Sequence, residues 1–131
     1  ADRLVDLYGR LGSRADPSLR DDVVQAWMDA EAYRLYTLAD VTAIADGTSV
    51  GARSSLNKVW WSELDVRLHE AALALLGPRA ELIDGSPGSV DDGAWMKGFE
   101  FALAGPIYAG TNEIQRNVIA ERVLGLPRGA R

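Results

Sequence analysis

Cysteine is absent from this 131-residue chain, and histidine occurs once, at His69. Without cysteine there is no disulfide framework, no thiolate nucleophile and no zinc site built on sulfur. A lone imidazole has no second one as co-ligand, so we interpret His69 as a partly exposed helix residue and expect no metal site. No apolar run approaches the roughly 18–20 residues of a membrane span, and residues 1–4 carry no signal pattern. We therefore expect a cytoplasmic protein without a membrane segment.

Basic residues are also scarce relative to acidic ones. Lys and Arg number 14 against 19 Asp and Glu, a formal net charge of -5. Proteins that bind nucleic acids usually carry clustered basic residues, so a nucleic-acid partner is not expected. The remaining composition, 47% hydrophobic and 25% charged, is that of an ordinary globular chain long enough to build one core.

The apolar residues recur at spacings of three and four, which is typical of helices, and no stretch alternates as a strand would. We predict an all-α fold, an antiparallel bundle of four or five helices. The expected helices cover residues 4–11, 16–47, 56–76, 95–104 and 111–124. The first looks too short to be whole, so residues 1–131 are interpreted as one helical domain that continues upstream.

Turn residues mark where these helices begin and end. Asp16-Pro17 supplies an N-cap and a first-turn proline, Gly47 ends that helix, and Gly77-Pro78 ends the next. The two long helices should pack antiparallel. The segment 78–93 contains a run of loop residues too long for a tight connection, so we predict a mobile loop.

Two pairs of neighbouring residues have simple interpretations. Asp91 and Asp92 precede a helix and are interpreted as its cap. Trp60 and Trp61 cannot share one face of a helix, so we expect at least one of them in a subunit interface.

The segment 105–114 is the place where chemistry is expected. Gly105-Pro106 breaks one helix, and a partly extended turn leads to Thr111, which can cap the next helix with Glu113 in its first turn. Free N–H groups at such a start favour phosphate or a developing oxyanion. The same residues also fit a plain cap and connector, and the residues alone leave both interpretations open.

Three stretches resemble acyl-CoA dehydrogenases. Residues 107–128, which begin Ile-Tyr-Ala-Gly-Thr-Asn-Glu-Ile-Gln-Arg, resemble the carboxy-terminal end of that family. Residues 55–64 (Ser-Leu-Asn-Lys-Val-Trp-Trp-Ser-Glu-Leu) and 74–78 (Ala-Leu-Leu-Gly-Pro) resemble the preceding helix of its bacterial branch. The resemblance covers most of the chain from about Asp16 onward.

The resemblance implies a flavoenzyme. Such enzymes remove the α-proton of an acyl-CoA thioester while the β-hydride passes to FAD, which leaves a trans-2-enoyl-CoA in fatty acid β-oxidation and related lipid metabolism. It also implies upstream helical and β-domains, a homo- or hetero-oligomer (dimer or tetramer) formed through helical faces, and electron-transfer flavoprotein as the partner of the full enzyme. This chain would then be a fragment of a longer chain and inactive alone.

The resemblance also implies roles for single residues. The family's commonest base is a glutamate directly before Gly-Thr, and Ala109 stands there, so no catalytic side chain is expected on this chain. The Ala109 backbone N–H can still polarise the thioester carbonyl. The implied substrate contacts are Tyr108 and Gly110, and the implied flavin contacts are Thr111 and Glu113. A second family flavin signature, contributed across a subunit interface and altered here at Ala74 and Pro78, adds Gly77.

The missing carboxylate leaves three explanations. The base can lie on an earlier helix upstream of Ala1, the chain can belong to a non-catalytic partner subunit of a heteromeric enzyme, or a base can lie elsewhere on this chain. Glu113 is the candidate for the third, but its simpler role is to stabilise the first turn of its helix. From a different class of function, a stand-alone helical interaction module would require the native protein to begin near Ala1.

Overall fold

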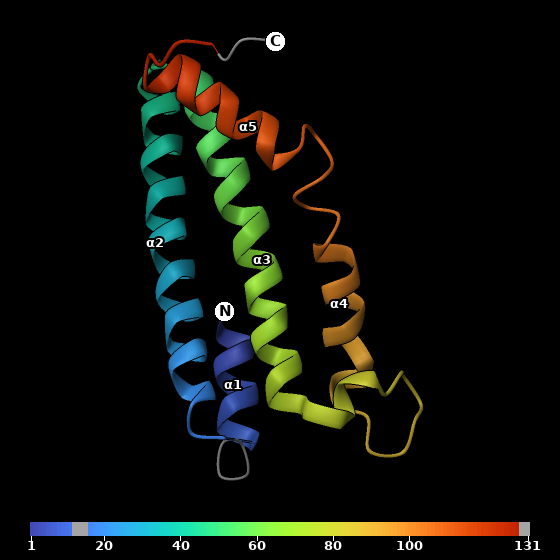
Figure 1. Cartoon of the computed structure of the whole chain (residues 1–131). Helices are drawn as coiled ribbons and strands as arrows, with labels where there is room; N and C mark the ends of the chain where they lie inside the picture. The colour runs from blue at the N-terminus through green and yellow to red at the C-terminus, as the bar shows by residue number, and fades with distance from the viewer. Residues whose placement is uncertain (12–15, 129–131) are drawn as a thin grey trace.

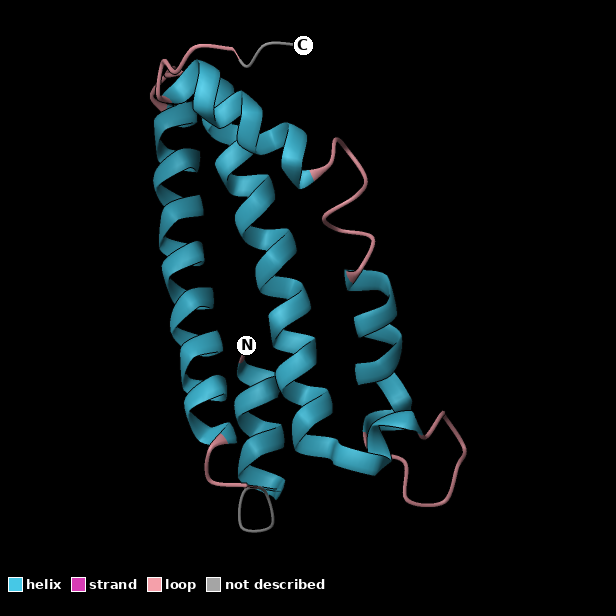
Figure 2. Ribbon diagram, in the orientation of Figure 1, coloured by secondary structure: helices cyan, strands magenta, loops and turns pink. Residues whose placement is uncertain are grey.

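The structure, a computed structural model, describes residues 1–11 and 16–128, and within these ranges it contains helices and no strand (Figure 2). The α-helices are α1 (Asp2–Leu11), α2 (Leu19–Ala45), α3 (Ser54–Leu76), α4 (Ala94–Ala102) and α5 (Asn112–Val118). Short 3-10 helices are η1 (Gly51–Arg53), η2 (Gly77–Glu81) and η3 (Asp91–Gly93), and η4 (Ile119–Val123) is a π-helical turn. The all-α prediction is confirmed.

The helix α3 is the centre of the molecule. It packs against α1, α2, α4 and α5. The long helices α2 and α3 run antiparallel, as predicted, while α1 lies against their lower ends and α4 covers the other side of α3 (Figure 1). The last helix differs from a simple bundle, because α5 crosses the upper end of α3 instead of running alongside it.

The hydrophobic core occupies the lower half of the bundle. Its buried residues are Leu4, Leu7, Val23, Ala26, Ala72, Leu75, Leu76, Ala80 and Trp95. Leu4 and Leu7 are almost fully inaccessible, which explains why a helix as short as α1 is held in place. Burial of one such leucine contributes roughly 1.5–3 kcal/mol.

The helix ends largely follow the turn residues. The Asp16 Oδ1 accepts the Ser18 N–H at 2.9 Å, and this bond lowers the pKa of Asp16 below its usual value. The bond closes the turn before α2, but the N-cap of α2 is Ser18, which makes no side-chain cap bond, so the predicted cap at Asp16 lies two residues too early. Gly47 ends α2 with a φ of 81°, and Gly77 ends α3 with a φ of 55°. The predicted stop at Gly12 lies outside the described residues.

The predicted loop 78–93 is more structured than expected at its two ends. The helix η2 occupies its first residues and η3 its last, which leaves residues 82–90 as the loop itself. Between these ends Ile83 is 68% exposed. The mobility of this segment remains a prediction.

The interpretation of Asp91 as a helix cap is wrong. Its carboxylate accepts two hydrogen bonds from the Arg10 guanidinium, at 2.9 and 2.8 Å, and one from the Trp95 indole at 2.8 Å. No side-chain cap bond is made at η3 or α4, and both Asp91 and Asp92 have a positive φ. The bidentate bond to the Arg10 guanidinium on α1 is stronger than a single cap bond, so the Asp91 carboxylate pairs with Arg10. Arg10 and Asp91 are 81 positions apart, so no local sequence pattern predicts their pairing.

The interpretation of His69 agrees with the structure. Its side chain is 19% exposed, its Nδ1 lies 2.8 Å from the Asp65 carbonyl oxygen, and its ring meets that of Trp95 edge-on.

Trp60 and Trp61 do lie on different sides of α3. Trp60 packs against Tyr33 and Tyr36 of α2, and Trp61 packs against the ring of Tyr108. Whether either lies in a subunit interface stays a prediction.

Neither a membrane span nor a metal cluster occurs within residues 1–11 and 16–128. No helix in these ranges is long and apolar enough to cross a membrane. The same ranges contain no group of three or more His, Cys, Asp or Glu side chains placed to hold a metal ion.

We predict that Asp91→Asn lowers the melting temperature of the chain by about 2–4 °C at pH 7, the size expected for one partly exposed charge pair in a small domain. Asparagine keeps the shape and tolerates the positive φ, so the change isolates the charge. The Arg10 bonds hold the folded-state pKa of Asp91 below its usual range. Its contribution is therefore present above the unfolded pKa and is lost as pH falls through the folded pKa.

Thermal unfolding followed by circular dichroism between pH 7 and pH 2 measures this effect. Asp92→Asn is the control, because Asp92 shares the positive φ and has no ion pair in the described part of the chain. A difference between wild type and Asp91→Asn that persists unchanged at the acid end would contradict the ion-pair explanation.

Candidate functional site

The segment between α4 and α5 is a closed loop. The Ala104 carbonyl accepts the N–H groups of Ile107 and Tyr108, each at 3.0 Å. The Pro106 carbonyl then accepts the N–H of Asn112 at 2.9 Å, which joins the two ends of the intervening residues. We call residues 107–111 the site turn. It rises along the side of α3 to the start of α5 (Figure 1).

The site turn has an unusual backbone at its tip. Ala109 has a φ of 53° and Gly110 a φ of 87°, and the left-handed region is costly for any residue with a Cβ. The Gln115 side-chain amide donates to the Ala109 carbonyl at 3.1 Å, and a Cβ on Gly110 would lie 2.6 Å from that amide nitrogen. The positive φ therefore favours glycine at position 110, and a Cβ there would displace the flexible Gln115 side chain from the Ala109 carbonyl.

The tip presents unpaired donors. Within residues 1–11 and 16–128, no protein group accepts the N–H of Ala109, Gly110 or Thr111. Ala109 and Gly110 are exposed as well. Exposed N–H groups held by a fixed backbone suit a carbonyl oxygen that gains negative charge, or a phosphate oxygen.

Thr111 and Glu113 form the cap of α5. The Thr111 Oγ1 accepts the Ile114 N–H at 3.4 Å, as predicted for a cap. The Glu113 carboxylate accepts its own backbone N–H and the Thr111 hydroxyl, which lowers the pKa of Glu113 below its ordinary value. A carboxylate with a lowered proton affinity is a poor general base, which favours the capping role of Glu113.

A polar cluster beneath the turn was missed by sequence reasoning. Asn112 is only 2% exposed and lies among Lys58, Ser62 and Glu63 of α3, with Arg116 paired to Glu63. We call these five residues the Asn112 cluster. The available signal was the spacing of Lys58 and Ser62, which puts two polar side chains four residues apart on a helix that is otherwise mostly apolar.

Several apolar side chains in and next to the site turn are exposed. Tyr108 packs on Trp61 with ring centroids 6.0 Å apart, yet it is 42% exposed. Other exposed apolar side chains on the same stretch of chain are Phe101, Leu103, Ile107 and Ile114. So much apolar surface in one stretch is typical of a face that another protein segment or a ligand covers.

Gly77 lies far from the site turn within one chain. Asn112 contacts Ser62, and Gly77 follows Ser62 by 15 residues along α3. At about 1.5 Å per residue, that distance along the helix is roughly 22 Å. One chain therefore does not bring Gly77 together with Thr111 and Glu113.

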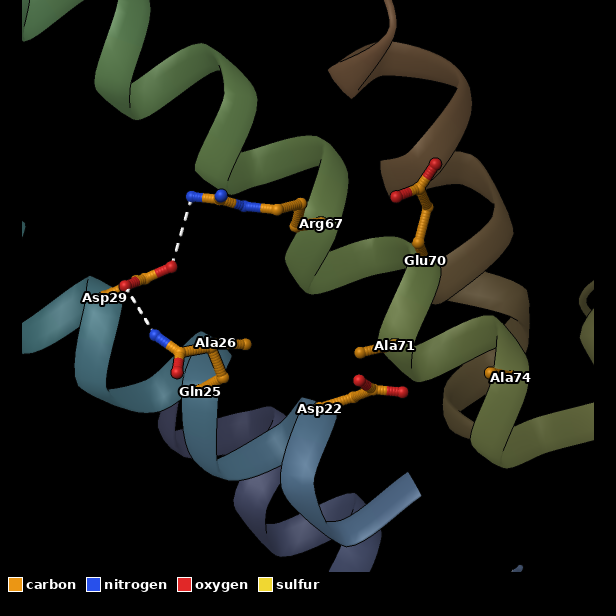
Figure 3. A pocket seen from close by; sticks show the side chains of 8 residues that line it. All are labelled: Asp22, Gln25, Ala26, Asp29, Arg67, Glu70, Ala71 and Ala74. Atoms are coloured by element: carbon orange, nitrogen blue, oxygen red, sulfur yellow. Dashed lines mark hydrogen bonds and ion pairs between the residues drawn. The ribbon is translucent and has the colours of Figure 1, made fainter. Parts of the chain in front are cut away.

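The groove near the Gly77 end of α3 is acidic. It measures about 380 Å³ and is lined by Asp22, Gln25, Ala26 and Asp29 of α2 and by Arg67, Glu70, Ala71 and Ala74 of α3 (Figure 3). Asp29 is neutralised by Arg67 at 3.2 Å and accepts the Gln25 amide at 3.0 Å. The carboxylates of Asp22 and Glu70 remain beside it.

These two regions differ in their fit to FAD. Phosphate oxygens would be repelled by Asp22 and Glu70, so the groove does not fit the pyrophosphate of a dinucleotide. The free N–H groups of the site turn and the Thr111 hydroxyl do fit polar groups of a flavin nucleotide or a thioester. Of the two regions, the site turn is the one that offers hydrogen-bond donors to such groups.

Comparison with known proteins agrees with the resemblance in the sequence. The model of the family "Acyl-CoA dehydrogenase, C-terminal domain" matches residues 9–124. Acyl-CoA dehydrogenase IpdE1 of Mycolicibacterium smegmatis is 38% identical over 125 residues, which is 95% of this chain and 30% of the relative. IpdE1 of Mycobacterium tuberculosis is 37% identical over 129 residues, 98% of this chain and 32% of the relative. The chain thus spans about a third of these relatives.

Solved structures share the fold. The Tcur3481-Tcur3483 steroid ACAD superposes with a TM-score of 0.87 at 23% identity, over 98% of this chain and 33% of that one. The ChsE4-ChsE5 complex from Mycobacterium tuberculosis gives a TM-score of 0.80 at 26% identity, over 97% and 34%. From the family match over most of its length, this chain belongs to the acyl-CoA dehydrogenase family, of which it is a C-terminal helical domain.

Proposed function

We propose that this chain is the C-terminal domain of a FAD-dependent enzyme that dehydrogenates an acyl-CoA thioester to the trans-2-enoyl-CoA. The observation that carries the proposal is the site turn, a fixed backbone whose N–H groups at Ala109 and Gly110 are free and exposed. FAD, when bound, supplies the acceptor for the β-hydride. Electron-transfer flavoprotein is the proposed acceptor for the full enzyme.

The chain's own part in this chemistry is electrostatic. Loss of the α-proton places negative charge on the thioester oxygen, and a backbone N–H aimed at that oxygen stabilises it. We assign this role to Ala109, with Gly110 and Tyr108 against the acyl group. Thr111 and Glu113 are the proposed contacts to the nucleotide part of the flavin. Gly77, which lies at the far end of α3 from the site turn, is a proposed flavin contact only across a subunit interface.

The proton acceptor has to come from outside this segment. The Ala109 methyl group takes no proton, Glu113 is held in its cap, and Glu63 is paired with Asn112 and Arg116. A base on an upstream helix is the first possibility. A second subunit that carries the complete site is the alternative, and it is favoured by neighbours that are two-component assemblies, the Tcur3481-Tcur3483 ACAD and the ChsE4-ChsE5 complex.

An oligomer is proposed on a second observation, the outer face of α2. Successive residues of a helix turn by about 100°, so Val24, Met28, Leu35 and Leu38 fall within about 80° of one another. All of them are between 45% and 58% exposed, and only the Arg34–Glu31 ion pair interrupts them. We call these four residues the α2 stripe and propose that it is covered in an assembly.

The first test compares the isolated chain with the full-length protein. We expect the full-length protein, with any subunit that copurifies, to contain FAD and to be bleached anaerobically by an acyl-CoA. The panel is a short-chain, a long-chain and a steroid-bearing CoA thioester, the last because one neighbour is a steroid ACAD. The isolated chain should be helical yet bind no FAD tightly, since it carries only one edge of the site. Stoichiometric flavin in the purified fragment would refute that expectation.

The second prediction concerns Ala109→Glu in the full-length protein. Alanine already holds a Cβ at the positive φ, so glutamate adds no further backbone strain at that position. In an inactive subunit the new carboxylate should create flavin reduction, because a positioned base gives roughly 10²- to 10⁴-fold in rate. Where a base already faces the site, two carboxylates would raise one pKa, and activity should fall or its pH optimum move.

Anaerobic flavin reduction between pH 6 and pH 9 separates these outcomes. Ala109→Gln is the matched control, since it has nearly the same shape and cannot accept a proton as a carboxylate does. If Ala109→Glu and Ala109→Gln both behave like wild type with substrate bound, Ala109 does not face the reacting carbon.

The third prediction concerns the α2 stripe. We expect the chain to associate as a dimer or larger species, and Leu35→Glu combined with Leu38→Glu should shift it toward monomer by at least about tenfold in dissociation constant. Asn117→Glu, an exposed change on α5, is the control. Light scattering across concentrations provides the measurement. A wild-type chain that stays monomeric at high concentration would remove the basis for this interface.

A further inference from the structure

Asn112 is a buried polar residue, only 2% exposed, at the junction of α3 and α5. Its Oδ1 accepts the Lys58 ammonium at 2.6 Å, and its Nδ2 lies 3.1 Å from both the Ser62 hydroxyl and the Glu63 carboxylate. Its backbone N–H closes the loop on the Pro106 carbonyl. This one residue therefore ties the end of the site turn to α3 through both main chain and side chain.

The partners of Asn112 require an amide. One of them is a cation that needs an acceptor, and the other is an anion that needs a donor, and only an amide of this size offers both. A carboxylate at position 112 would meet Glu63 with like charge. An apolar side chain there would leave Lys58 and Glu63 without their shared partner, which is costly at a buried position.

The rest of the Asn112 cluster supports this arrangement. Ser62 is fully buried and donates to the Val59 carbonyl at 3.1 Å, so its hydroxyl oxygen is free to accept from Asn112. Arg116 pairs with Glu63 and fixes the carboxylate from the α5 side. The charged groups that face position 112 are thus Lys58 and Glu63 of α3, with Arg116 and Glu113 of α5 nearby.

Asn112 does not stand alone in shaping the turn. Gln115 holds the Ala109 carbonyl from the exposed side, and Tyr108 rests on Trp61. Both of those contacts set the local shape of residues 108–110. Tyr108 reaches α3 through ring packing on Trp61, whereas Asn112 joins the end of the turn to α3 by directed hydrogen bonds to Lys58, Ser62 and Glu63.

We propose that Asn112 is a positioning residue: it fixes the site turn on α3 so that the Ala109 N–H keeps the direction needed for the thioester oxygen. It acts through the backbone and does not touch the substrate. This inference rests on the proposed function. Misplacement of a reacting group by about 1 Å can cost roughly 100-fold in rate, so loss of this anchor should be visible in kcat.

The test uses the full-length protein, with any copurifying subunit, and the panel thioester that the wild type oxidises fastest. We expect Asn112→Asp to lower kcat by about 10- to 100-fold at pH 8, with FAD content and KM changed less than threefold. Activity should recover as pH falls, because the introduced carboxyl group, once protonated, can again donate to Glu63. Asn117→Asp, the same change at an exposed position of α5, should match wild type.

A second-site change makes the test specific to this contact. Glu63→Gln places an amide donor opposite the introduced carboxylate, so Asn112→Asp with Glu63→Gln should regain most of the lost kcat and lose the pH dependence. A merely structural role predicts neither effect. The proposal is overturned if Asn112→Asp matches Asn117→Asp at every pH, or if its loss of kcat shows neither acid recovery nor rescue by Glu63→Gln.

Backbone hydrogen exchange separates this inference from the proposed function. Residues 104–115 contain the bonded N–H groups of Ile107, Tyr108 and Asn112, and their exchange should speed up in Asn112→Asp and slow again in the double variant. That readout needs no flavin. A full-length protein without FAD or activity would refute the proposed function, whereas unchanged exchange over 104–115 would refute the anchoring by Asn112 whatever the activity.

Ser62→Ala covers the case in which Asn112→Asp fails to fold. It removes the Ser62 hydroxyl, which lies within hydrogen-bond distance of both the Nδ2 and the Oδ1 of Asn112, and leaves Lys58 and Glu63 in place. Faster exchange over residues 104–115 and a smaller loss of kcat, about two- to tenfold, are expected in this variant. Exchange and kcat both equal to wild type would overturn the proposal.

Discussion

The packing of every other helix on α3 is the constraint on which the structure depends. Its lower end is held by apolar burial, where Leu75 and Leu76 share a core with α1 and Trp95. Its upper end is held by polar contacts, where Ser62 and Glu63 receive Asn112. The apolar end tolerates small shifts, because dispersion and burial have no direction, while hydrogen bonds with charged partners fix direction. Apolar burial therefore stabilises the packing at the lower end of α3, and hydrogen bonds set the orientation of α5 at its upper end.

The elements of this fold were predictable because their signals are local. Spacings of three and four along the chain, the turn at Asp16-Pro17, Gly47 and Gly77 all act within one or two turns, and the helices begin and end near the predicted residues. The direction of α5 was not predictable in this way. It crosses α3 because Asn112 pairs with residues about 50 positions earlier, and no local pattern encodes that pairing.

The candidate site likewise contains residues that local sequence signals identify and residues whose partners are distant in the sequence. Thr111 and Glu113 could be identified from their place at the start of a helix, and Gly110 from the family resemblance, and the structure gives each a local role in the turn or the cap. Asn112 stands among them in the sequence and was overlooked, because its importance comes from burial and from partners on another helix. Gly77 was assigned by resemblance alone, and its distance from the turn within one chain was visible only in three dimensions. Asp91 was misjudged for the reason that explains α5, a partner distant in sequence.

The π-helical turn η4 sets which side the residues at the end of α5 face. Its signature is the bond from the Leu124 N–H to the Ile119 carbonyl, one residue wider than an α-helical bond. Such a turn is equivalent to a single inserted residue, and each residue of an α-helix accounts for about 100° of rotation. Deletion of one residue here would let α5 continue regularly, but it would turn Arg122, Leu124 and the tail beyond them to a different side. A chimera joined within residues 119–123 therefore keeps the direction of the residues that follow only if it carries the whole turn.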